Sequence, residues 1–519
     1  MNSTSIHYHG QRYIVEAGET LLAALLRQGA PVSYSCGKGS CHSCALKLQS
    51  GQVRHTREVD PALHASGHVL PCHAHPLGEV WLAPAELEQV AITGELMSRR
   101  ELAPGIFELG IAPLKEMDWQ GGQHLSLVRR DGTTRNYSIA SLPGDDFLFL
   151  LHVRRGATGG MSAWLCEQAP IGEPLGLLPP RGDCHYTADM ADQPLLLLST
   201  GAGAGALLAV ARQALDAGHA APIRFLHGVR NTADRYLHDV LLDLERRHPQ
   251  FRYQACLSAD SGEPLANTIH GRVTRIFDEC HDLTGTRVFL CGLPAMVEDA
   301  RCLAIAHGVR RDHLHADPFD SAGPAQPRDA EKISATRPDP ELWAALDHGP
   351  RLRRALESFY QQVYQDERLA PFFARVPIER ITSKQYAFLA DLFSGRREYF
   401  GLKPYNAHHW MVISDELFDH HEELFEAALR QHGLSEHLVH RVGGMLERFR
   451  AEIVKPAARG LFVEGREHAL LTDEVEILDM ANVCDGCGRE IAAGQPARYQ
   501  HRLGTLHCAG CANLPPGQA

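Results

Sequence analysis

The sequence predicts a multidomain protein with an antiparallel β unit, a doubly wound α/β unit, an all-α unit and two small metal-bearing units. Three observations support this prediction. A chain of 519 residues is too long for a single hydrophobic core. Its apolar pattern changes from short strands, to alternating strands and helices, and then to helical stripes alone. Eight of its 14 cysteines fall into two groups that lie far apart.

Composition and charge exclude several classes of protein. Charged residues make up 22% of the chain and apolar residues 44%, as in ordinary globular proteins. The formal net charge of -12 argues against a nucleic-acid surface, which needs a basic stripe. The start, MNSTSIHYHG, lacks the apolar core of a secretory signal, and glycines interrupt the longest apolar run. We therefore expect a cytoplasmic protein without a membrane or nucleic-acid partner, in which grouped cysteines ligate metals.

The first cysteine group lies in residues 1–88 and consists of Cys36, Cys41, Cys44 and Cys72. Three of these cysteines are separated by four and then by two residues, and the fourth is distant, which is the plant-type ligand pattern of a [2Fe–2S] cluster. A structural zinc site is the alternative, although zinc favours paired Cys-x-x-Cys knuckles. The region resembles plant-type ferredoxins over its full length, and this resemblance implies a β-grasp fold.

Short strands and turns fill residues 89–188, which is typical of a small antiparallel β-barrel. The RNYS stretch at 135–138 offers a cation for a phosphate, an aromatic face for a flavin ring and a hydroxyl near its edge. The GGMS turn at 159–162 lets backbone N–H groups approach a pyrophosphate. A strand edge and a plain glycine turn remain the alternative for either stretch alone.

Strands and helices alternate in residues 189–320, which predicts a doubly wound parallel sheet with its ligand at the carboxyl ends of the strands. The apolar run at 195–198 leads into a GAGAG turn at 201–205 and then into a helix expected from Leu207. A glycine-rich turn after a strand is by itself a weak signal for a nucleotide, because glycine also serves close helix packing.

The RNYS, GGMS and GAGAG stretches, followed by HGVR at 227–230 and CGLPAM at 291–296, resemble the ferredoxin–NADP reductase superfamily in order and spacing. With the cluster unit in front, residues 1–320 resemble the reductase components of bacterial multicomponent oxygenases. Asp234, close to Arg230 in sequence, favours NADH over NADPH. The resemblance implies FAD on Arg135, Tyr137, Ser138, Gly160 and Ser162, and a nicotinamide dinucleotide on Gly201, Gly203, Arg230, Cys291 and Gly292.

A proline-rich linker at 321–340 precedes an expected all-α unit at 341–465. After the linker the strand signals cease, and apolar residues form helical stripes over 352–363, 417–429 and 438–453. We expect these helices to pack around one core.

Two of the stripes carry a polar residue at an inward position, Tyr360 and His421. An unpaired polar group there costs about 1–3 kcal/mol, and a satisfied structural residue is the commoner explanation. The FY pair at 359–360 and the H-x-x-M-x-I string from His408 resemble the truncated haemoglobins. This resemblance implies haem b with His408 as the proximal iron ligand and His409 as the alternative. It also makes Tyr360 the distal residue and His421 a second candidate catalytic residue, where many members have Trp.

The last segment, 466–519, carries two Cys-x-x-Cys knuckles, formed by Cys484, Cys487, Cys508 and Cys511. Paired knuckles at this spacing predict a tetrahedral site that most often holds structural Zn²⁺. A rubredoxin-like iron site with the same ligands is the alternative. So short a segment has little core of its own, and the metal must supply much of its folding free energy.

These parts predict an NAD(P)H-dependent oxidoreductase that passes electrons to its own globin haem for O₂ and nitric oxide chemistry, like a nitric oxide dioxygenase. A flavin takes the electron pair of a hydride and releases the two electrons one at a time. An iron–sulfur cluster and a haem both require such single electrons. Flavohaemoglobins join the same functions in a different domain order, so this comparison is an analogy. One alternative is a reductase that feeds a separate oxygenase or other acceptor protein, with the globin as a sensor or supply of O₂ or nitric oxide. Another is a non-enzymatic sensor or scaffold whose tail docks a partner.

Overall fold

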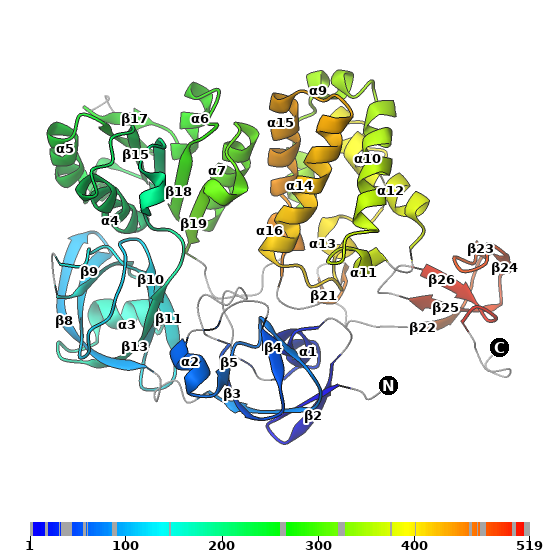
Figure 1. Cartoon of the computed structure of the whole chain (residues 1–519), viewed down its shortest axis with the longest axis horizontal. Helices are drawn as coiled ribbons and strands as arrows, with labels where there is room; N and C mark the ends of the chain where they lie inside the picture. Colours follow the sequence, from blue (N-terminus) through cyan, green and yellow to red (C-terminus); the bar gives the residue numbers. More distant parts are fainter. Residues whose placement is uncertain are drawn as a thin grey trace.

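The computed structural model describes residues 4–15, 19–30, 32, 44–55, 59, 61–85, 91–144, 147–259, 266–319, 327–373, 376–399, 401–455, 459–463, 466–467, 474–500 and 505–512. Within these ranges the chain forms the predicted succession of units (Figure 1). None of the helices described is long and apolar enough to cross a lipid bilayer.

The N-terminal unit is a five-stranded mixed sheet in the order β2-β1-β7-β3-β5 with helix α1 beside it (Figure 1). Its elements are β1 (Ser5–Tyr8), β2 (Gln11–Ile14), α1 (Leu21–Arg27), β3 (Leu46–Ser50), β4 (Val53–His55), α2 (Pro61–Ala65), β5 (His68–Val69), β6 (Ala74–Pro76) and β7 (Val80–Pro84). Thr20 caps α1, since its Oγ1 accepts a hydrogen bond from the N–H of Ala23 at 3.2 Å. A mixed sheet with one packed helix confirms the predicted ferredoxin-type fold.

The second unit is a six-stranded antiparallel sheet in the order β11-β10-β13-β8-β9-β12. Its elements are β8 (Ile92–Ala103), β9 (Ile106–Pro113), β10 (His124–Val128), β11 (Thr134–Ser138), β12 (Phe149–Arg154), α3 (Met161–Glu167) and β13 (Pro174–Arg181). A bridge between Ile139 and Leu151 joins the ends of the two edge strands. The sheet therefore curls back on itself, as expected for a small barrel.

The third unit is an all-parallel sheet in the order β17-β16-β15-β14-β18-β19. Its elements are β14 (Leu195–Thr200), α4 (Gly203–Asp216), β15 (Ile223–Val229), α5 (His238–Arg247), β16 (Phe251–Leu257), β17 (Thr268–His270), α6 (Ile276–Glu279), β18 (Arg287–Gly292), α7 (Pro294–Ala306) and β19 (Leu314–Pro318). Helices α4 and α5 cover one face of the sheet, and α6 and α7 cover the other. Because β15 and β18 flank β14 on opposite sides, the switch point of this fold lies beside β14.

Helix α4 begins four residues earlier than the sequence predicted. It starts at Gly203 instead of Leu207, so Gly203 and Gly205 of the GAGAG stretch lie in its first turn. A Cβ atom on Gly203 would lie 2.4 Å from the carbonyl oxygen of Cys291. The glycine thus lets the start of the helix pack directly on the end of β18.

The fourth unit is entirely helical and has one continuous core (Figure 1). Its helices are α9 (Pro340–Ala345), α10 (Pro350–Val363), α11 (Ala370–Phe373), α12 (Ile378–Ser394), α13 (Pro404–Ala407), α14 (Asp415–Gln431), α15 (Glu436–Glu447) and α16 (Arg450–Ile453). The three predicted stripes correspond to α10, to α14 and to the pair α15 and α16. The expected linker contains a further short helix, α8 (Asp329–Ala335).

The described part of the C-terminal segment is a set of short strands. It comprises β20 (Phe462–Val463), β21 (Arg466–Glu467), β22 (Glu474–Ile477), β23 (Asn482–Val483), β24 (Glu490–Ile491), β25 (Pro496–Gln500) and β26 (Thr505–Cys508). A small apolar cluster around Cys484 and Ile491 is its core, which agrees with a fold that depends on a metal.

Candidate functional site

The glycines at the switch point let the carboxyl ends of β14 and β18 and the start of α4 pack closely together. Gly292 has a φ of +132°, and a Cβ atom there would lie 2.3 Å from Thr200 Oγ1. That hydroxyl accepts a hydrogen bond from the N–H of Leu293 at 2.8 Å. The fold therefore brings Gly201, Gly203, Cys291 and Gly292 together where a parallel sheet binds its ligand.

The RNYS and GGMS stretches also meet in space. Tyr137 Oη lies 3.1 Å from Ser162 Oγ, and Gly160 is the N-cap residue of α3. Burial raises the pKa of Tyr137 to about 12, so its phenol stays protonated at any physiological pH. Arg135 is exposed and donates to the carbonyl of Thr134 at 2.8 Å.

Asp317 joins the flavin barrel to the switch point, and the sequence analysis missed it. Ser138 Oγ donates a hydrogen bond to Asp317 Oδ2 at 2.5 Å. Burial raises the pKa of Asp317, and its nearness is one reason, after burial, why the pKa of Cys291 is also raised. The carboxyl group thus lies between the predicted flavin hydroxyl and the predicted nicotinamide-site thiol. Its only sequence signal is its place at the end of the last parallel strand.

A second link between the barrel and the nucleotide unit is also absent from the sequence prediction. His152 Nε2 lies 3.3 Å from Glu108 Oε2, and His152 Nδ1 lies 3.2 Å from Tyr236 Oη. A Cβ atom on Gly205 would lie 2.1 Å from His152 Nδ1. The close approach of α4 to this imidazole packs the flavin barrel and the nucleotide unit against each other next to the glycine turn.

Asp234 has a local structural role in addition to its predicted effect on cofactor choice. Its Oδ2 accepts a hydrogen bond from the N–H of Asn231 at 3.1 Å, within a capping box. Arg230 is exposed beside it. The Asp234 carboxylate already accepts this backbone hydrogen bond, and that contact does not distinguish NADH from NADPH. The preference for NADH therefore stays a prediction.

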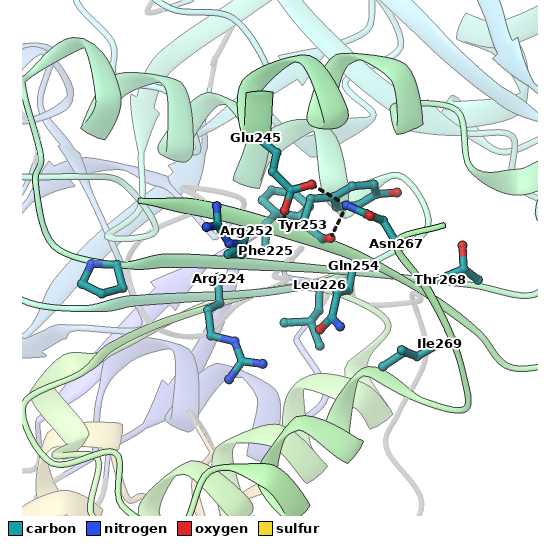
Figure 2. Close-up of a pocket in the computed structure, with 11 residues that line it drawn as sticks. Arg224, Phe225, Leu226, Glu245, Arg252, Tyr253, Gln254, Asn267, Thr268 and Ile269 are labelled. Carbon is teal, nitrogen blue, oxygen red and sulfur yellow. Dashed lines mark hydrogen bonds between the residues drawn. The ribbon is translucent and has the colours of Figure 1, made fainter. Parts of the chain in front are cut away.

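A pocket of about 600 Å³ opens at the other end of the parallel sheet (Figure 2). Its lining includes Pro222, Arg224 and Arg252, which lie at the starts of β15 and β16. Asn267 donates to the carbonyl of Tyr253 at 3.2 Å across its rim (Figure 2). The pocket lies at the amino ends of these strands and contains none of the predicted cofactor residues, so it is not the nucleotide site.

Two of the predicted cluster ligands lie side by side in the N-terminal unit. The Sγ atoms of Cys44 and Cys72 are 3.3 Å apart, and both residues are buried. Cys36 and Cys41 lie outside the described residues. The described pair is compatible with two thiolate ligands of one small cluster.

The histidines predicted as proximal ligands follow helix α13. His408 Nδ1 donates to the carbonyl of Pro404 at 2.9 Å, and His409 Nδ1 donates to the carbonyl of Asn406 at 2.7 Å. Each imidazole therefore has Nε2 as its lone-pair nitrogen, the form that a haem ligand needs. Burial, with the nearby charge of Lys455, lowers the pKa of His408 to about 3, so its ring is neutral.

The two predicted distal residues, Tyr360 and His421, both contact Phe359. Tyr360 is 2% exposed, and no partner for its hydroxyl is found among the residues that the structure describes. His421 contacts Phe359 edge to face with ring centroids 5.0 Å apart, and its charge contributes to the low pKa of His408. Tyr360 and His421 therefore both pack against Phe359 within the core of the helical unit.

The segment after α16, residues 459–463, packs over the proximal histidines. The side chain of Asn406 pairs with both backbone groups of Phe462, at 2.9 Å in each direction. The N–H of Arg459 donates to the carbonyl of His409 at 2.8 Å. We call residues 459–463 the proximal clamp.

Lys455 extends this contact on the other side. Its Nζ donates to the carbonyl of His408 at 2.5 Å, and its N–H donates to the carbonyl of Ile413 at 3.0 Å. Burial lowers the pKa of Lys455 well below its ordinary value. The backbone carbonyls of His408 and His409 therefore accept hydrogen bonds from Lys455 and Arg459. Both of these residues lie outside the three predicted helical stripes.

The four cysteines of the C-terminal knuckles converge. The Sγ atoms of Cys484, Cys487, Cys508 and Cys511 all lie within 4.8 Å of one another. Burial alone would raise the pKa of Cys484, but backbone N–H groups lower it to about 6, which favours the thiolate that binds metal. Asp485, between the first two cysteines, forms an ion pair with Arg380 of α12 and so anchors the tail to the helical unit.

Family comparisons agree with this arrangement along most of the chain. Residues 6–77 match the 2Fe-2S iron-sulfur cluster binding domain, and 102–186 match the oxidoreductase FAD-binding domain. Residues 197–302 match the oxidoreductase NAD-binding domain, and 342–455 match the bacterial-like globin family.

Curated relatives cover the first part of the chain. The reductase subunit of an aromatic O-demethylase from an Amycolatopsis species is 32% identical over 312 residues, which is 56% of this chain and 90% of that protein. The chain belongs to the family of NAD(P)H-dependent FAD oxidoreductases with a [2Fe–2S] domain. In this reductase a globin follows the nucleotide unit.

Two further comparisons involve proteins of the same kind. The ferredoxin–NAD(P)(+) reductase component of naphthalene 1,2-dioxygenase/salicylate 5-hydroxylase systems from a Ralstonia species is 27% identical over 317 residues, or 59% of this chain and 95% of that protein. A crystal structure of an Amycolatopsis cytochrome P450 reductase is 27% identical with a TM-score of 0.45, covering 62% of this chain and 100% of that one.

The residues of the reductase fit each implied group. The phenol, hydroxyls and N-cap glycine suit FAD, the paired thiols suit a [2Fe–2S] cluster, and the neutral imidazoles suit haem. The tetrahedral set of four thiols suits either Zn²⁺ or iron. Bound FAD would take one hydride, which carries two electrons, from a nicotinamide and release those electrons one at a time.

Replacing Asp317 with asparagine is expected to stabilise the reductase at high pH. Because the folded pKa of Asp317 is raised, ionisation destabilises the fold as the pH rises above the ordinary value of 3.8. The Asp317→Asn Tm should therefore exceed the wild-type Tm at pH 8, and the gap should shrink toward pH 4. Each unit by which folding raises the pKa of Asp317 lowers the free energy of unfolding at high pH by about 1.4 kcal/mol.

Asp312→Asn is the matched control for this thermal experiment. The Arg310 guanidinium holds the pKa of Asp312 below its ordinary value, so asparagine there should lose stability at pH 8. A Tm gap for Asp317→Asn that is the same at both pH values would contradict the assignment of a buried carboxyl whose pKa is raised.

Replacing Cys484 or Cys508 with serine is expected to unfold only the C-terminal segment. Its apolar core is small, so metal ligation supplies most of its folding free energy. Elemental analysis of the wild-type reductase should give one zinc per chain in addition to its cofactor iron. If the wild-type protein instead contains a red, redox-active iron centre that both variants lack, a rubredoxin-like iron site would be favoured over structural zinc.

Proposed function

We propose that this chain reduces its own globin haem with electrons from NADH and uses that haem for O₂ and nitric oxide chemistry of the nitric oxide dioxygenase type. The main support is that the globin is docked on the nucleotide unit of the reductase within one chain. Arg301 Nε of α7 lies 3.0 Å from Glu447 Oε1 of α15, and Lys332 lies 2.7 Å from Glu452 while also pairing with Glu298. Because each of these pairs crosses from the reductase to the globin and would leave a buried charge uncompensated if one partner were lost, they couple the two units.

The proposed electron route starts at the switch point and ends at His408. NADH would bind at the glycines beside Cys291, with its nicotinamide facing a flavin held by the RNYS and GGMS stretches. The cluster on Cys36, Cys41, Cys44 and Cys72 would carry single electrons onward. Plant-type clusters lie near about -400 mV, which is low enough to reduce a haem. The Cys484 site, with Zn²⁺, would be structural.

Anaerobic stopped-flow mixing with NADH tests this route. The haem absorption of the purified chain should change to the reduced form within seconds, and aerobic addition of nitric oxide should then lead to its NADH-dependent consumption. NADPH serves as the comparison for cofactor choice. Reduction of the flavin without reduction of the haem would contradict the proposal.

The second candidate is a reductase that feeds a separate oxygenase, with the globin as a sensor or supply domain for O₂ or nitric oxide. The names of the relatives favour it, since they are reductase subunits or components of O-demethylase and dioxygenase systems. Cytochrome c is a suitable surrogate acceptor. Rapid NADH-driven reduction of cytochrome c, while the globin haem stays oxidised, would support this candidate over the first.

Tyr360→Phe is expected to speed O₂ dissociation from the reduced protein about tenfold, because a net hydrogen bond is worth about 1–1.5 kcal/mol. The phenol is a buried donor without a partner in the described part of the protein, so it is available to a ligand. His421→Leu should act in the same direction with a smaller effect. Stopped-flow O₂ release measures both. An unchanged rate of O₂ release in both variants would favour the second candidate function, in which the globin is a sensor.

A further inference from the structure

Helix α15 of the globin lies along helix α7 of the nucleotide unit, and two adjacent glycines make this contact possible (Figure 1). A Cβ atom on Gly444 would lie 2.6 Å from a backbone carbonyl oxygen of α7 and 2.7 Å from the Cβ atom of Ala306. A Cβ atom on Gly443 would lie 2.6 Å from Glu426 Oε1 and 3.3 Å from Arg311 Nη2. Glycine destabilises a helix interior relative to alanine, so this pair has a packing role.

Arg311 of the nucleotide unit reaches through this contact into an acidic stripe on α14. The stripe consists of Asp415, Asp419, Glu422 and Glu426, whose spacing places them on one face of the helix. The Arg311 side chain is 7% exposed, with Nη1 2.7 Å from Glu426 and Nε 3.6 Å from Asp419. Burial lowers the pKa of Arg311, but the charges of Glu426 and Glu422 outweigh it and raise the pKa. The guanidinium is therefore a permanent cation for this stripe.

Glu422 connects the stripe to the interior of the globin. It is 4% exposed, and its Oε1 lies 3.0 Å from His421 Nδ1. Its Oε2 is buried without a hydrogen-bond partner in the described structure. A buried carboxylate needs a compensating positive charge. Arg311 contacts Asp419 and Glu426, which lie one turn before and one turn after Glu422 on the same face of α14, so its positive charge acts on Glu422 from the neighbouring unit.

We propose that Arg311 of the nucleotide unit is a positioning residue for the globin, because its charge stabilises the Glu422 carboxylate that orients the His421 imidazole against Phe359. The proposal deepens the proposed function, since it rests on haem binding next to His408. It does not depend on how the haem is reduced. The nucleotide unit thereby acts on ligand binding in the globin as well as on NADH.

Arg311→Met in the full chain tests the proposal after reduction with dithionite, which bypasses NADH and the flavin. We expect the CO dissociation rate to change about threefold in the same direction as in His421→Leu, within the range of one weakened hydrogen bond. The double variant should behave like His421→Leu alone. Arg310→Met is the matched control, because its side chain is 68% exposed and pairs with Asp312. Wild-type rates in Arg311→Met, or additive effects in the double variant, would overturn the proposal.

Glu422→Gln separates positioning from general loosening of the fold. Glutamine keeps an acceptor for His421 Nδ1 and removes the buried charge that Arg311 compensates. Adding Arg311→Met to Glu422→Gln should therefore change the CO rate less than twofold. A change as large as in Arg311→Met alone would contradict the assigned chain from Arg311 through Glu422 to His421.

Hydrogen exchange provides a readout that needs no haem. Arg311→Met should increase amide exchange in α14, whereas Arg310→Met should not. Gly444→Leu should increase exchange in both α7 and α15 by displacing the globin, and it should reproduce the change in CO rate seen in Arg311→Met. Ala427→Leu, at an exposed position on α14, is the control for added bulk. Unchanged exchange in α14 of Arg311→Met would also overturn the proposal.

Discussion

Alanine in place of His408 is expected to abolish stable haem binding. The His408 ring is neutral, and its Nδ1 donates to the carbonyl of Pro404, which leaves the lone pair of Nε2 to bind the iron of a haem, as we propose. Losing the proposed protein ligand of the iron should lower the haem content of the purified chain more than tenfold, since changes in even outer contacts of a metal site cost about 10–100-fold. The haem-to-protein absorbance ratio measures this loss.

His409→Ala is the matched control for this prediction. Its Nδ1 donates to the carbonyl of Asn406, so alanine there should weaken local packing but leave the haem in place. Equal haem loss in both variants would leave the register of the proximal ligand unassigned. Loss in His409→Ala alone would move the ligand to His409.

Alanine in place of Cys72 is expected to slow NADH-driven haem reduction at least about a hundredfold while flavin reduction remains fast. Cys72 lies beside Cys44, and a [2Fe–2S] cluster needs four thiolates, so the variant should lack the cluster's visible absorption. Anaerobic stopped-flow spectra follow flavin and haem separately. Cys256→Ala, which removes a buried thiol from the parallel sheet, is the control.

Two other outcomes of this experiment would be informative. Fast haem reduction in the Cys72 variant would mean that electrons pass directly from the flavin to the haem. Loss of flavin reduction in that variant would mean that the assumed order of carriers is wrong. Either result contradicts the route through the cluster.

Local patterns in the sequence predicted the fold well. The capping role of Thr20, the buried strand before the glycine turn and the three helical stripes all depend on neighbours within a few residues. The RNYS and GGMS stretches were predicted to share one ligand, and Tyr137 indeed lies next to Ser162. Fixed motif spacing carries this kind of information across short distances.

Residues that act through tertiary contacts were not predicted. The acidic stripe on α14 has the spacing of an ordinary solvated helix face, and it becomes an internal charge site where Arg311 docks on it beside Arg450 of α16. Asp317 follows an unremarkable strand, and its position beside Ser138 depends on contact between two units. The roles of Arg311 and Asp317 have no local signature in the sequence, because the partner of each lies more than a hundred residues away along the chain.

The proximal clamp has a practical consequence for anyone who excises the globin. The match to the globin family ends at residue 455, before the residues that pair with Asn406 and with the carbonyl of His409. A fragment cut at that boundary would keep every helix of the unit yet lose two of the supports of the iron-ligand segment. Its oxygen affinity would then describe the fragment and not the intact enzyme, so the smallest faithful fragment has to run past Val463.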